Sequence, residues 1–380
     1  EVSHLTKRYG THTAIADLSF HIEKGQIYGL LGPNGAGKST TMNIMTGCLS
    51  ASSGSVTVGG HDIFEESGPA KRLLGYLPER PPLYLDRTPW EYLSFVGQAK
   101  GVAKEDLDEQ IHHVMEVTRI ADVSQRLIKN LSKGYQQRVG IARAFAANPP
   151  IVLMDEPFSA LDPMTRAELQ NEIHDLQTKA QKTVVFVTHD MDEAIKLADR
   201  ICIIQDGKVA QCDTPENILK HPANQYVTEF IGANRLWANP EYIRAADIMR
   251  RRPFTISKGR TVIQALQIMR HNSVDSLLVL DKGQTLLGVV WLEELIGKRE
   301  ADPIEYYISD DYIAVEGETS LKEIIATIDY DVSGIIPVIQ HDRKLLGYLT
   351  KSIILATMSK QFVPEHTAGE RSGVICPATL

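Results

Sequence analysis

The sequence contains, at residues 32–40, the run Gly32-Pro33-Asn34-Gly35-Ala36-Gly37-Lys38-Ser39-Thr40, a complete G-x-x-x-x-G-K-[ST] pattern. The apolar residues 26–31 before it predict a strand, and residues 41–46 predict the continuation of a helix. In this setting, backbone N–H groups of the loop surround the β-phosphate of a nucleotide. Lys38 reaches the β- and γ-phosphates, and the Ser39 hydroxyl ligates Mg²⁺. Because every fixed position is filled, we predict a nucleoside-triphosphate site rather than a chance glycine-rich turn.

Length, charge and cysteine content narrow the class of protein. The chain has 380 residues, which is enough for two or three domains with sizeable cores. Its formal net charge of −8 gives no indication of a nucleic-acid partner. The four cysteines show no C-x-x-C spacing, so we expect structural thiols in a reduced cytosolic protein. No apolar run approaches the roughly 18 to 20 residues that span a membrane, and no signal peptide is expected.

Two carboxylates follow another apolar strand. Residues 151–154 are apolar, and Asp155 and Glu156 come directly after them. Since the carboxyl ends of parallel strands meet at one edge of a sheet, these acids should lie beside the glycine loop. We predict that Asp155 holds Mg²⁺, directly or through water, and that Glu156 orients and deprotonates the attacking water. Either acid alone would be an ordinary polar strand end, but together with the loop they favour catalysis.

Two further segments predict contacts with phosphate. Residues 183–188 form a parallel-type strand that ends at His189, where a histidine can contact the γ-phosphate and respond to its loss. A lone histidine is more often structural, but this position favours a catalytic role. Ser132 and Gly134 come directly before a helical pattern at residues 139–145, and such a helix N-terminus can bind an anion.

These motifs together resemble an ATP-binding cassette (ABC) transporter ATPase, over about residues 1–235. The acids continue as Phe158-Ser159-Ala160-Leu161-Asp162, which is similar to the D-loop of that family. Residues 131–135 (LSKGY) stand in for its L-S-G-G-Q signature. Tyr9, just ahead of the first strand, lies where family members stack an aromatic ring on adenine. Glu79 lies where many members place a glutamine that senses Mg²⁺ and the membrane partner.

The resemblance implies a mechanism in which two ATPase chains close head to tail around two ATP molecules. Ser132 and Gly134 of one chain would complete the γ-phosphate site of the other, so a second copy or close relative is an expected partner. Lys38, Glu156 and His189 are the expected catalytic residues, and Ser39 and Asp155 the expected Mg²⁺ ligands. The residues expected to bind ATP are Tyr9, Gly32, Pro33, Asn34, Gly35, Ala36, Gly37, Lys38, Ser39, Thr40, Glu79, Ser132, Gly134 and Asp162.

The chain departs from the family pattern at two places near the nucleotide. Lys133 and Tyr135 replace the usual glycine and glutamine of the signature, while Gly134, which must lie close to phosphate, is retained. Glu79 carries a charge where the usual glutamine carries an amide donor. Both features are similar to an exporter-like, ABC-2-type branch of the family, as are residues 25–145 in general.

The second part of the chain contains an internal repeat with a period of roughly 59 residues. Residues 262–269 align with residues 321–328 on helical spacing, and residues 286–288 align with residues 345–347, both LLG. Each repeat predicts the order helix, strand, turn, strand, helix. This resembles a tandem pair of CBS (cystathionine-β-synthase-type) domains, which often bind adenine nucleotides and regulate an attached enzyme.

The CBS ligand motif G-x-x-[ST]-x-x-D is incomplete in both repeats. The first has Trp291 in place of the hydroxyl residue and retains an acid at Glu294. The second retains Thr350 and has Ile353 in place of the acid. Two alternatives stay open: the pair binds an adenine nucleotide or cyclic dinucleotide, or it is a structural, dimerising pair without a ligand.

An ABC ATPase joined to a CBS pair resembles the ATPase of quaternary-amine (glycine betaine, carnitine, choline) importers, most closely over residues 155–235. This implies transmembrane permease partners, a solute-binding protein, regulation by the CBS pair and a peripheral position on the cytoplasmic face of the inner membrane. Residues 79–101 would form the groove that receives the permease. The alternatives are the ATPase of an ABC-2-type exporter and a non-transport, nucleotide-sensing regulator, and the complete catalytic set argues against the regulator.

The predicted fold class is α/β: a P-loop ABC ATPase core with a mostly parallel sheet and a helical subdomain, plus a C-terminal α+β tandem CBS domain pair. We expect the ATPase domain at residues 1–235, with its helical subdomain at about 80–145. The first CBS domain and its linker are expected at 236–300, and the second at 301–360. Residues 361–380 lack periodicity and are expected to form a flexible tail.

Overall fold

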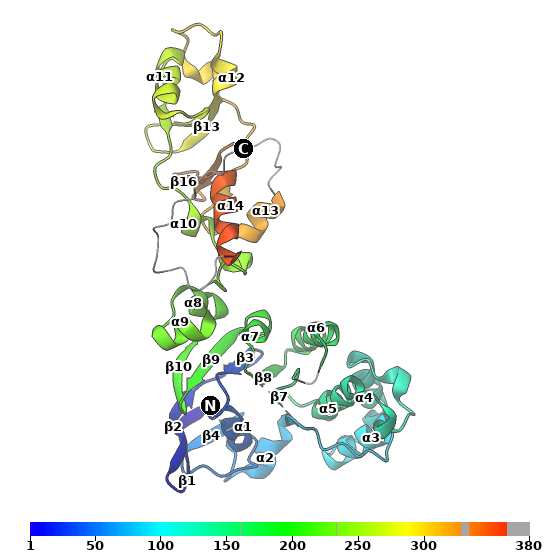
Figure 1. Ribbon diagram of the computed structural model, residues 1–380. Coiled ribbons are helices and arrows are strands. Elements are labelled where there is room, and N and C mark those ends of the chain that lie inside the picture. Colours follow the sequence, from blue (N-terminus) through cyan, green and yellow to red (C-terminus); the bar gives the residue numbers. More distant parts are fainter. Residues whose placement is uncertain (160, 233, 328–333, 363–380) are drawn as a thin grey trace, which may run out of the picture. The chain divides into compact units, whose positions relative to one another are not determined.

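The computed structural model describes residues 1–159, 161–232, 234–327 and 334–362 (Figure 1). The chain forms two compact units, Glu1–Ile231 and a second that begins at Gly232. Ala160 of the predicted D-loop and all but the first two residues of the predicted tail lie outside the described residues. Among the described residues, no helix has the length and apolar character needed to cross a membrane.

The first unit is built on a six-stranded sheet with the order β10-β9-β3-β8-β7-β6. Its strands are parallel except for β10, which pairs antiparallel with β9. Every residue of β3 and β8 is buried, as expected for parallel strands covered on both faces. The strands are β3 (Ile27–Leu31), β6 (Leu74–Leu77), β7 (Ile151–Asp155), β8 (Thr183–Thr188), β9 (Arg200–Gln205) and β10 (Lys208–Asp213).

Helices cover this sheet and follow its strands in the chain. Helix α1 (Lys38–Met45) begins directly after the glycine loop, and α6 (Pro163–Ala180) follows Asp162, whose side chain caps it. Helix α7 (Met191–Leu197) follows β8 after two residues. The remaining helices of this part are α8 (Pro215–Lys220) and α9 (Gln225–Ile231).

A smaller antiparallel sheet packs beside the first one, with the order β2-β1-β4-β5. One apolar core joins the two sheets, since Leu5 and Ile15 of the small sheet cluster with Leu30 and Val187 of the large one. Helix α2 (Ser67–Arg72) leads from this sheet to β6. The four strands are β1 (Val2–Tyr9), β2 (His12–Phe20), β4 (Ser53–Val58) and β5 (His61–Asp62).

Helices fill the chain between β6 and β7, where the sequence predicts a helical subdomain. Thr88 and Glu91 form a capping box at the start of α3, which explains where that helix begins. The subdomain also packs closely on the sheet: a side chain at Gly75 of β6 would lie 2.0 Å from the carbonyl oxygen of Ala144. Its elements are α3 (Pro89–Ala99), α4 (Lys104–Val117), η1 (Ala121–Val123), η2 (Ile128–Asn130) and α5 (Lys133–Phe145).

The second unit contains the predicted repeat. Each half has a three-stranded sheet in which the first strand runs parallel to the second and the third runs antiparallel. The first half contains β11 (Thr255–Ser257), α11 (Val262–Asn272), β12 (Ser276–Leu280), β13 (Leu286–Trp291) and α12 (Leu292–Leu295). The second half contains β14 (Val315–Glu316), α13 (Leu321–Thr327), β15 (Ile336–Ile339), β16 (Leu345–Leu349) and α14 (Lys351–Ser359).

Short elements connect and flank these halves, and each half has its own apolar core. Val262 and Val279 lie in one core, and Leu321 and Val338 lie in the other, as the repeat alignment requires. The predicted order of helix, strand, turn, strand and helix is therefore present twice. The flanking elements are η3 (Pro240–Tyr242), α10 (Ala245–Ile248), η4 (Ile304–Tyr307) and η5 (Lys360–Phe362).

Candidate functional site

The glycine loop passes directly from β3 into α1. Gly37, the residue before α1, has a φ of 100°, a left-handed conformation that favours glycine. A side chain there would also lie 2.6 Å from the carbonyl oxygen of Ala14. The loop can therefore turn tightly and direct the first N–H groups of α1, which have no partner inside the helix, toward a phosphate.

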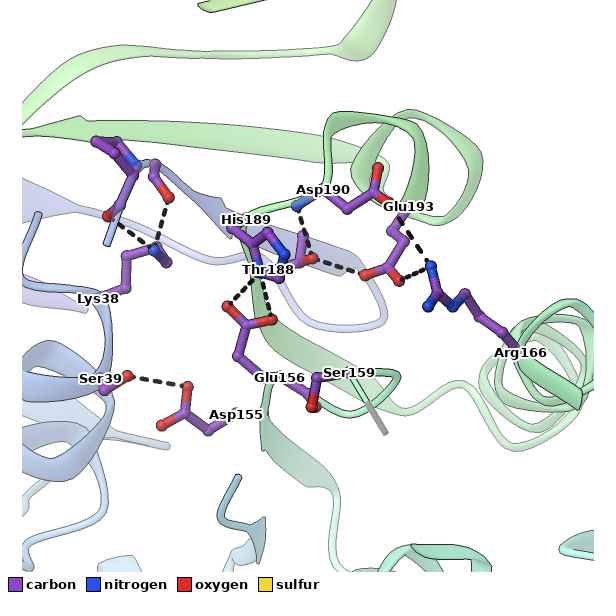
Figure 2. Close-up of polar contacts among 12 residues, drawn as sticks. Lys38, Ser39, Asp155, Glu156, Ser159, Arg166, Thr188, His189, Asp190 and Glu193 are labelled. Atoms are coloured by element: carbon purple, nitrogen blue, oxygen red, sulfur yellow. Dashed lines mark hydrogen bonds and ion pairs between the residues drawn. The ribbon is translucent and has the colours of Figure 1, made fainter. Parts of the chain in front are cut away.

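Lys38 lies folded over this loop (Figure 2). Its ammonium donates to the carbonyl oxygen of Gly32 at 2.6 Å and to that of Pro33 at 3.0 Å. Burial lowers the pKa of Lys38, and the nearby carboxylates of Glu156 and Asp155 oppose that shift. A partly desolvated cation at the start of α1 attracts a polyphosphate strongly.

Asp155 ends β7 beside Ser39 of α1. The Ser39 hydroxyl donates to Oδ1 of Asp155 at 3.2 Å, so the two expected Mg²⁺ ligands are adjacent. Burial raises the pKa of Asp155 to about 6, against the hydrogen bond from Ser39, and the carboxylates of Glu156 and Glu79 raise it further. A bound cation favours the ionised form of such a desolvated carboxyl group.

Glu156 and His189 meet at the ends of two neighbouring strands (Figure 2). Nδ1 of His189 lies 3.0 Å from Oε2 and 3.1 Å from Oε1 of Glu156. The backbone of Glu156 has a φ of 47°, in the left-handed region that costs free energy for a residue with a side chain. This conformation turns the carboxylate out of the line of β7 and toward β8.

A cavity of about 560 Å³ lies over the loop, and it is large enough for a nucleotide. The structure thus gathers most of the predicted residues around one space. Its lining consists of Tyr9, His12, Ala14, Asn34, Gly35, Gly37, Lys38, Ser39, Thr40, Glu79, Glu156, Ser159 and His189.

Several predicted residues do not line this cavity. Gly32, Pro33 and Ala36 belong to the loop, and Asp155 lies buried at 4% exposure beside Ser39. Ser132 caps α5 by accepting from the N–H of Tyr135 at 3.4 Å, and Gly134 lies one residue inside that helix. Asp162 caps α6 by accepting from the N–H of Thr165 at 3.0 Å. Ser132, Gly134 and Asp162 are therefore not brought to the cavity within one chain.

Tyr9 was predicted to lie just ahead of the first strand, and this prediction was wrong. Tyr9 is the last residue of β1 and pairs with His12 across a hairpin. That pairing brings His12 and Ala14 into the cavity wall, and no sequence signal marked them. Ser159 was also missed as a site residue, although it lies in the quoted D-loop and donates to the carbonyl oxygen of Glu156 at 3.1 Å.

Together, this sheet, loop and pair of strand-end acids define a P-loop nucleoside triphosphatase. The family model of the ABC transporter matches residues 15–159, and that of the CBS domain matches residues 245–297 and 304–360. The dimeric structure of MJ0796, a bacterial ABC transporter cassette, aligns with a TM-score of 0.52 at 28% identity, covering 56% of this chain and 97% of that one.

Two relatives match this chain over more than nine-tenths of its length, so the similarity covers both the ATPase region and the CBS pair. The carnitine transport ATP-binding protein OpuCA of Listeria monocytogenes is 37% identical over 93% of this chain and 90% of its own length. The glycine betaine/carnitine/choline transport ATP-binding protein OpuCA of Bacillus subtilis is 38% identical, over 91% of this chain and 92% of its own. The chain belongs to this family of ABC transporter ATP-binding subunits with tandem CBS domains. It is an ATPase, and the predicted fold class and family are confirmed.

Proposed function

We propose that this chain powers the uptake of a quaternary-amine osmoprotectant such as glycine betaine, carnitine or choline. The observation that carries the proposal is the match to relatives named for transport of these solutes, which extends over more than nine-tenths of this chain. The match includes the CBS pair as well as the ATPase core, which supports a regulated importer subunit. We also propose that the chain divides into an ATPase domain at residues 1–235, a first CBS domain with its linker at 236–300 and a second CBS domain at 301–360.

Mg²⁺ fits the oxygen atoms that Ser39 and Asp155 place together. Among the described residues, no group of three or more His, Cys, Asp or Glu side chains could hold a metal ion alone. Mg²⁺ would therefore take its remaining ligands from nucleotide phosphates and water, as it usually does. When bound, it neutralises charge that develops on the phosphates during hydrolysis.

The remaining roles belong to the protein side chains. Lys38 exchanges its two loop carbonyls for the β- and γ-phosphate oxygens, and Tyr9 stacks on the adenine ring. Glu156 accepts the proton of the attacking water and directs that water toward the γ-phosphate. His189, in contact with Glu156, holds the carboxylate in place and meets the γ-phosphate.

A second copy of the chain would complete each site. Ser132 and Gly134 lie at the N-terminus of the 13-residue helix α5, which presents unpaired N–H groups to an anion. Asp162 likewise lies at the start of α6, outside the cavity of its own chain. These positions support a head-to-tail dimer in which each chain supplies them to the ATP of its partner.

The permease would dock on the helical subdomain. Tyr84, Leu85 and Phe95 are each about half exposed, although large apolar side chains are usually buried. The ring centroids of Tyr84 and Phe95 lie 5.8 Å apart, so these two rings form one apolar patch, and Leu85 is the next residue in the chain after Tyr84. The patch lies in the segment 79–101 that the family resemblance assigns to the permease, and it supports a peripheral position on the cytoplasmic face of the inner membrane.

The CBS pair would bind a regulatory adenine nucleotide or cyclic dinucleotide. Trp291 and Glu294 of the incomplete motif line a cavity of about 450 Å³ in the second unit. Thr350, the motif hydroxyl of the other repeat, caps α14 by accepting from the N–H of Ile353 at 3.3 Å. A ligand in the cavity beside Trp291 and Glu294 would link solute uptake to the nucleotide content of the cell.

The proposed partners are tested by affinity capture of tagged Glu156→Gln chain from detergent-solubilised bacterial membranes in the presence of ATP. We expect recovery of an importer permease, with or without its solute-binding protein, by mass spectrometry. Lys38→Ala is the control, because a chain that cannot hold ATP should not form the closed complex. Recovery of an ABC-2-type permease instead would overturn the importer assignment and support the exporter alternative.

A further inference from the structure

A chain of polar contacts joins two loops that border the nucleotide site, and Figure 2 shows its part from Arg166 through Glu193 to Thr188. Arg166, on α6, donates through Nη2 to the carbonyl oxygen of Leu161 at 3.3 Å. Its Nη1 atom lies 3.5 Å from Oε1 of Glu193 and 3.8 Å from Oδ2 of Asp190. One guanidinium therefore contacts both the loop after Glu156 and the loop after β8.

Glu193 passes this contact on to the end of β8. Its side chain is buried on α7, and Oε2 accepts from the Thr188 hydroxyl at 2.6 Å. The same hydroxyl oxygen accepts from the N–H of Asp190 at 3.0 Å. Thr188 and Asp190 are the two neighbours of His189 in the chain, so this hydroxyl fixes the backbone on both sides of the histidine.

Thr188 and Glu193 are buried, so each needs its hydrogen-bond partner within the protein. Thr188 is fully buried, and desolvation raises the pKa of Glu193, which the hydrogen bond from Thr188 opposes. Asp190 and Glu156 raise that pKa further, while Arg166 lowers it. A buried carboxylate needs a full set of partners, and loss of one leaves a costly unsatisfied group.

We propose that Arg166, Glu193 and Thr188 are positioning residues for ATP hydrolysis, which hold His189 against Glu156. The inference rests on the roles proposed above for Glu156 and His189. The side chain of His189 is 59% exposed, so packing around the ring contributes little to its placement. The position of the ring therefore depends on the backbone of residues 188–190. The Thr188 hydroxyl holds that backbone in place through its hydrogen bonds to Glu193 and to the N–H of Asp190. A displacement of about 1 Å at a catalytic group can cost a hundredfold in rate.

The test compares Thr188→Val with Thr188→Ser in steady-state ATPase assays of the purified full chain. Valine keeps the branched shape and removes the hydroxyl, so Glu193 and the N–H of Asp190 lose their shared partner. We expect kcat to fall about tenfold, with KM for ATP changed less than about twofold. Serine retains the hydroxyl, and Thr188→Ser is expected to recover most of the turnover.

A double-mutant cycle with His189→Ala separates positioning from general loss of structure. If the contacts act through His189, Thr188→Val lowers kcat in the native background and has little further effect beside His189→Ala. If circular dichroism shows that Thr188→Val does not fold, Arg166→Gln and Arg166→Lys provide a second test. Arg166 is partly exposed, so its substitution is less disruptive to the core. We expect the lysine variant to retain more turnover than the glutamine variant.

Three results would overturn the inference: normal kcat in both Thr188→Val and Arg166→Gln, a rise in KM that matches the fall in kcat, or full additivity with His189→Ala. Glu156→Gln serves as the reference. Turnover that survives in Glu156→Gln would overturn the catalytic assignment itself. Turnover that is lost in Glu156→Gln but normal in both Thr188→Val and Arg166→Gln would overturn only the positioning role.

Discussion

Glu156 combines a strained backbone with the carboxylate that is proposed to activate water. Glu156→Gln keeps the size and the left-handed backbone but removes the ability to accept a proton. We expect turnover to fall by about two to four orders of magnitude, because that is the usual contribution of a general base. Binding of a fluorescent ATP analogue should stay within about threefold of the native chain. Substantial turnover in this variant would favour another base, and loss of binding would indicate misfolding.

Asp155 should make stability depend on pH when nucleotide and Mg²⁺ are absent. Burial raises the pKa of its carboxyl from 3.8 to about 6 in the folded chain, so the unfolded chain releases this proton first as pH rises. Its contribution to the free energy of unfolding is therefore full below about pH 4 and lost as pH rises through about 6.

Asp155→Asn cannot ionise and should avoid this loss. Relative to the native chain, it should gain about 1 kcal/mol between pH 4 and 7, after allowance for solvent screening. Urea denaturation in the presence of EDTA measures the difference at each pH. If the free energies of unfolding of the native chain and of Asp155→Asn change in parallel with pH across this range, the result would contradict the burial of Asp155. Added Mg²⁺ and ATP should reverse the order, since a bound cation favours the ionised carboxylate.

The placement of some candidate residues was predictable, because a motif fixes both their spacing and a strand end. Asp155 ends β7, His189 follows β8, and Lys38 comes after β3 and its glycine loop, and the sheet brings those strand ends together. His12 and Arg166 were not predictable in this way. His12 reaches the cavity through a hairpin pairing, and Arg166 contacts a carboxylate on another helix, so both depend on tertiary packing rather than on local pattern.

Helices α5 and α6 are joined by an ionic cluster with a buried centre, Arg138 and Glu172. Arg138 of α5 donates to Oε2 of Glu172 at 2.8 Å, and both side chains are nearly buried. Nη2 of Arg138 also lies 3.4 Å from Oε2 of Glu168, and Nε of Arg119 lies 2.9 Å from Oε1 of Glu172. Burial raises the pKa of Glu172, while the two arginines oppose that shift. The cluster fixes α5, which Ser132 caps, relative to α6, which Asp162 caps.

Removing only Arg138 should therefore destabilise the chain. In Arg138→Met the carboxylate of Glu172 stays buried with one partner fewer, and we expect a loss of about 3 kcal/mol. Arg138→Met combined with Glu172→Leu should recover much of it, because no charge is then left buried. Urea denaturation followed by Trp90 fluorescence in a Trp237→Phe, Trp291→Phe background measures the helical subdomain directly. A double variant less stable than Arg138→Met would contradict this explanation.

At the scale of elements, strands with strong apolar runs were predicted well and the antiparallel sheet was not. Residues 26–31 and 151–154 predicted β3 and β7 because a strand buried on both faces is a continuous apolar run. In β1 only Val2 and Leu5 are buried, so the strand lacks a regular alternation of buried and exposed residues, and its pairing with β2 contains several register shifts. Such irregular pairing is fixed by contacts between distant residues, which a single sequence does not display.

At the scale of the whole molecule, ATP should control association of two copies. Ser132 is exposed and caps α5, so Ser132→Arg places a bulky cation where the ATP of the partner would lie. Loss of the cap costs about 1 kcal/mol, which leaves the chain folded. In the Glu156→Gln background with ATP, we expect native Ser132 to give a dimer by light scattering and Ser132→Arg to remain monomeric.

Ser132→Asn is the matched control, because asparagine also caps a helix and adds no charge. It should retain dimerisation within the same background. Dimers of Ser132→Arg in the presence of ATP would contradict a composite site between two chains. Circular dichroism of each variant, compared with the native chain, ensures that a monomer reflects a changed surface and not an unfolded domain.

The left-handed backbone at Glu156 sets protein engineering and catalysis against each other. Glycine or asparagine would relieve the φ of 47° at no steric cost or little, so either should raise the melting temperature. Either would also delete the carboxylate that is proposed to activate water. A laboratory selection for heat resistance alone would therefore tend to favour variants without ATPase activity. Residue 156 should be kept as glutamate in any search for thermostable variants of this chain.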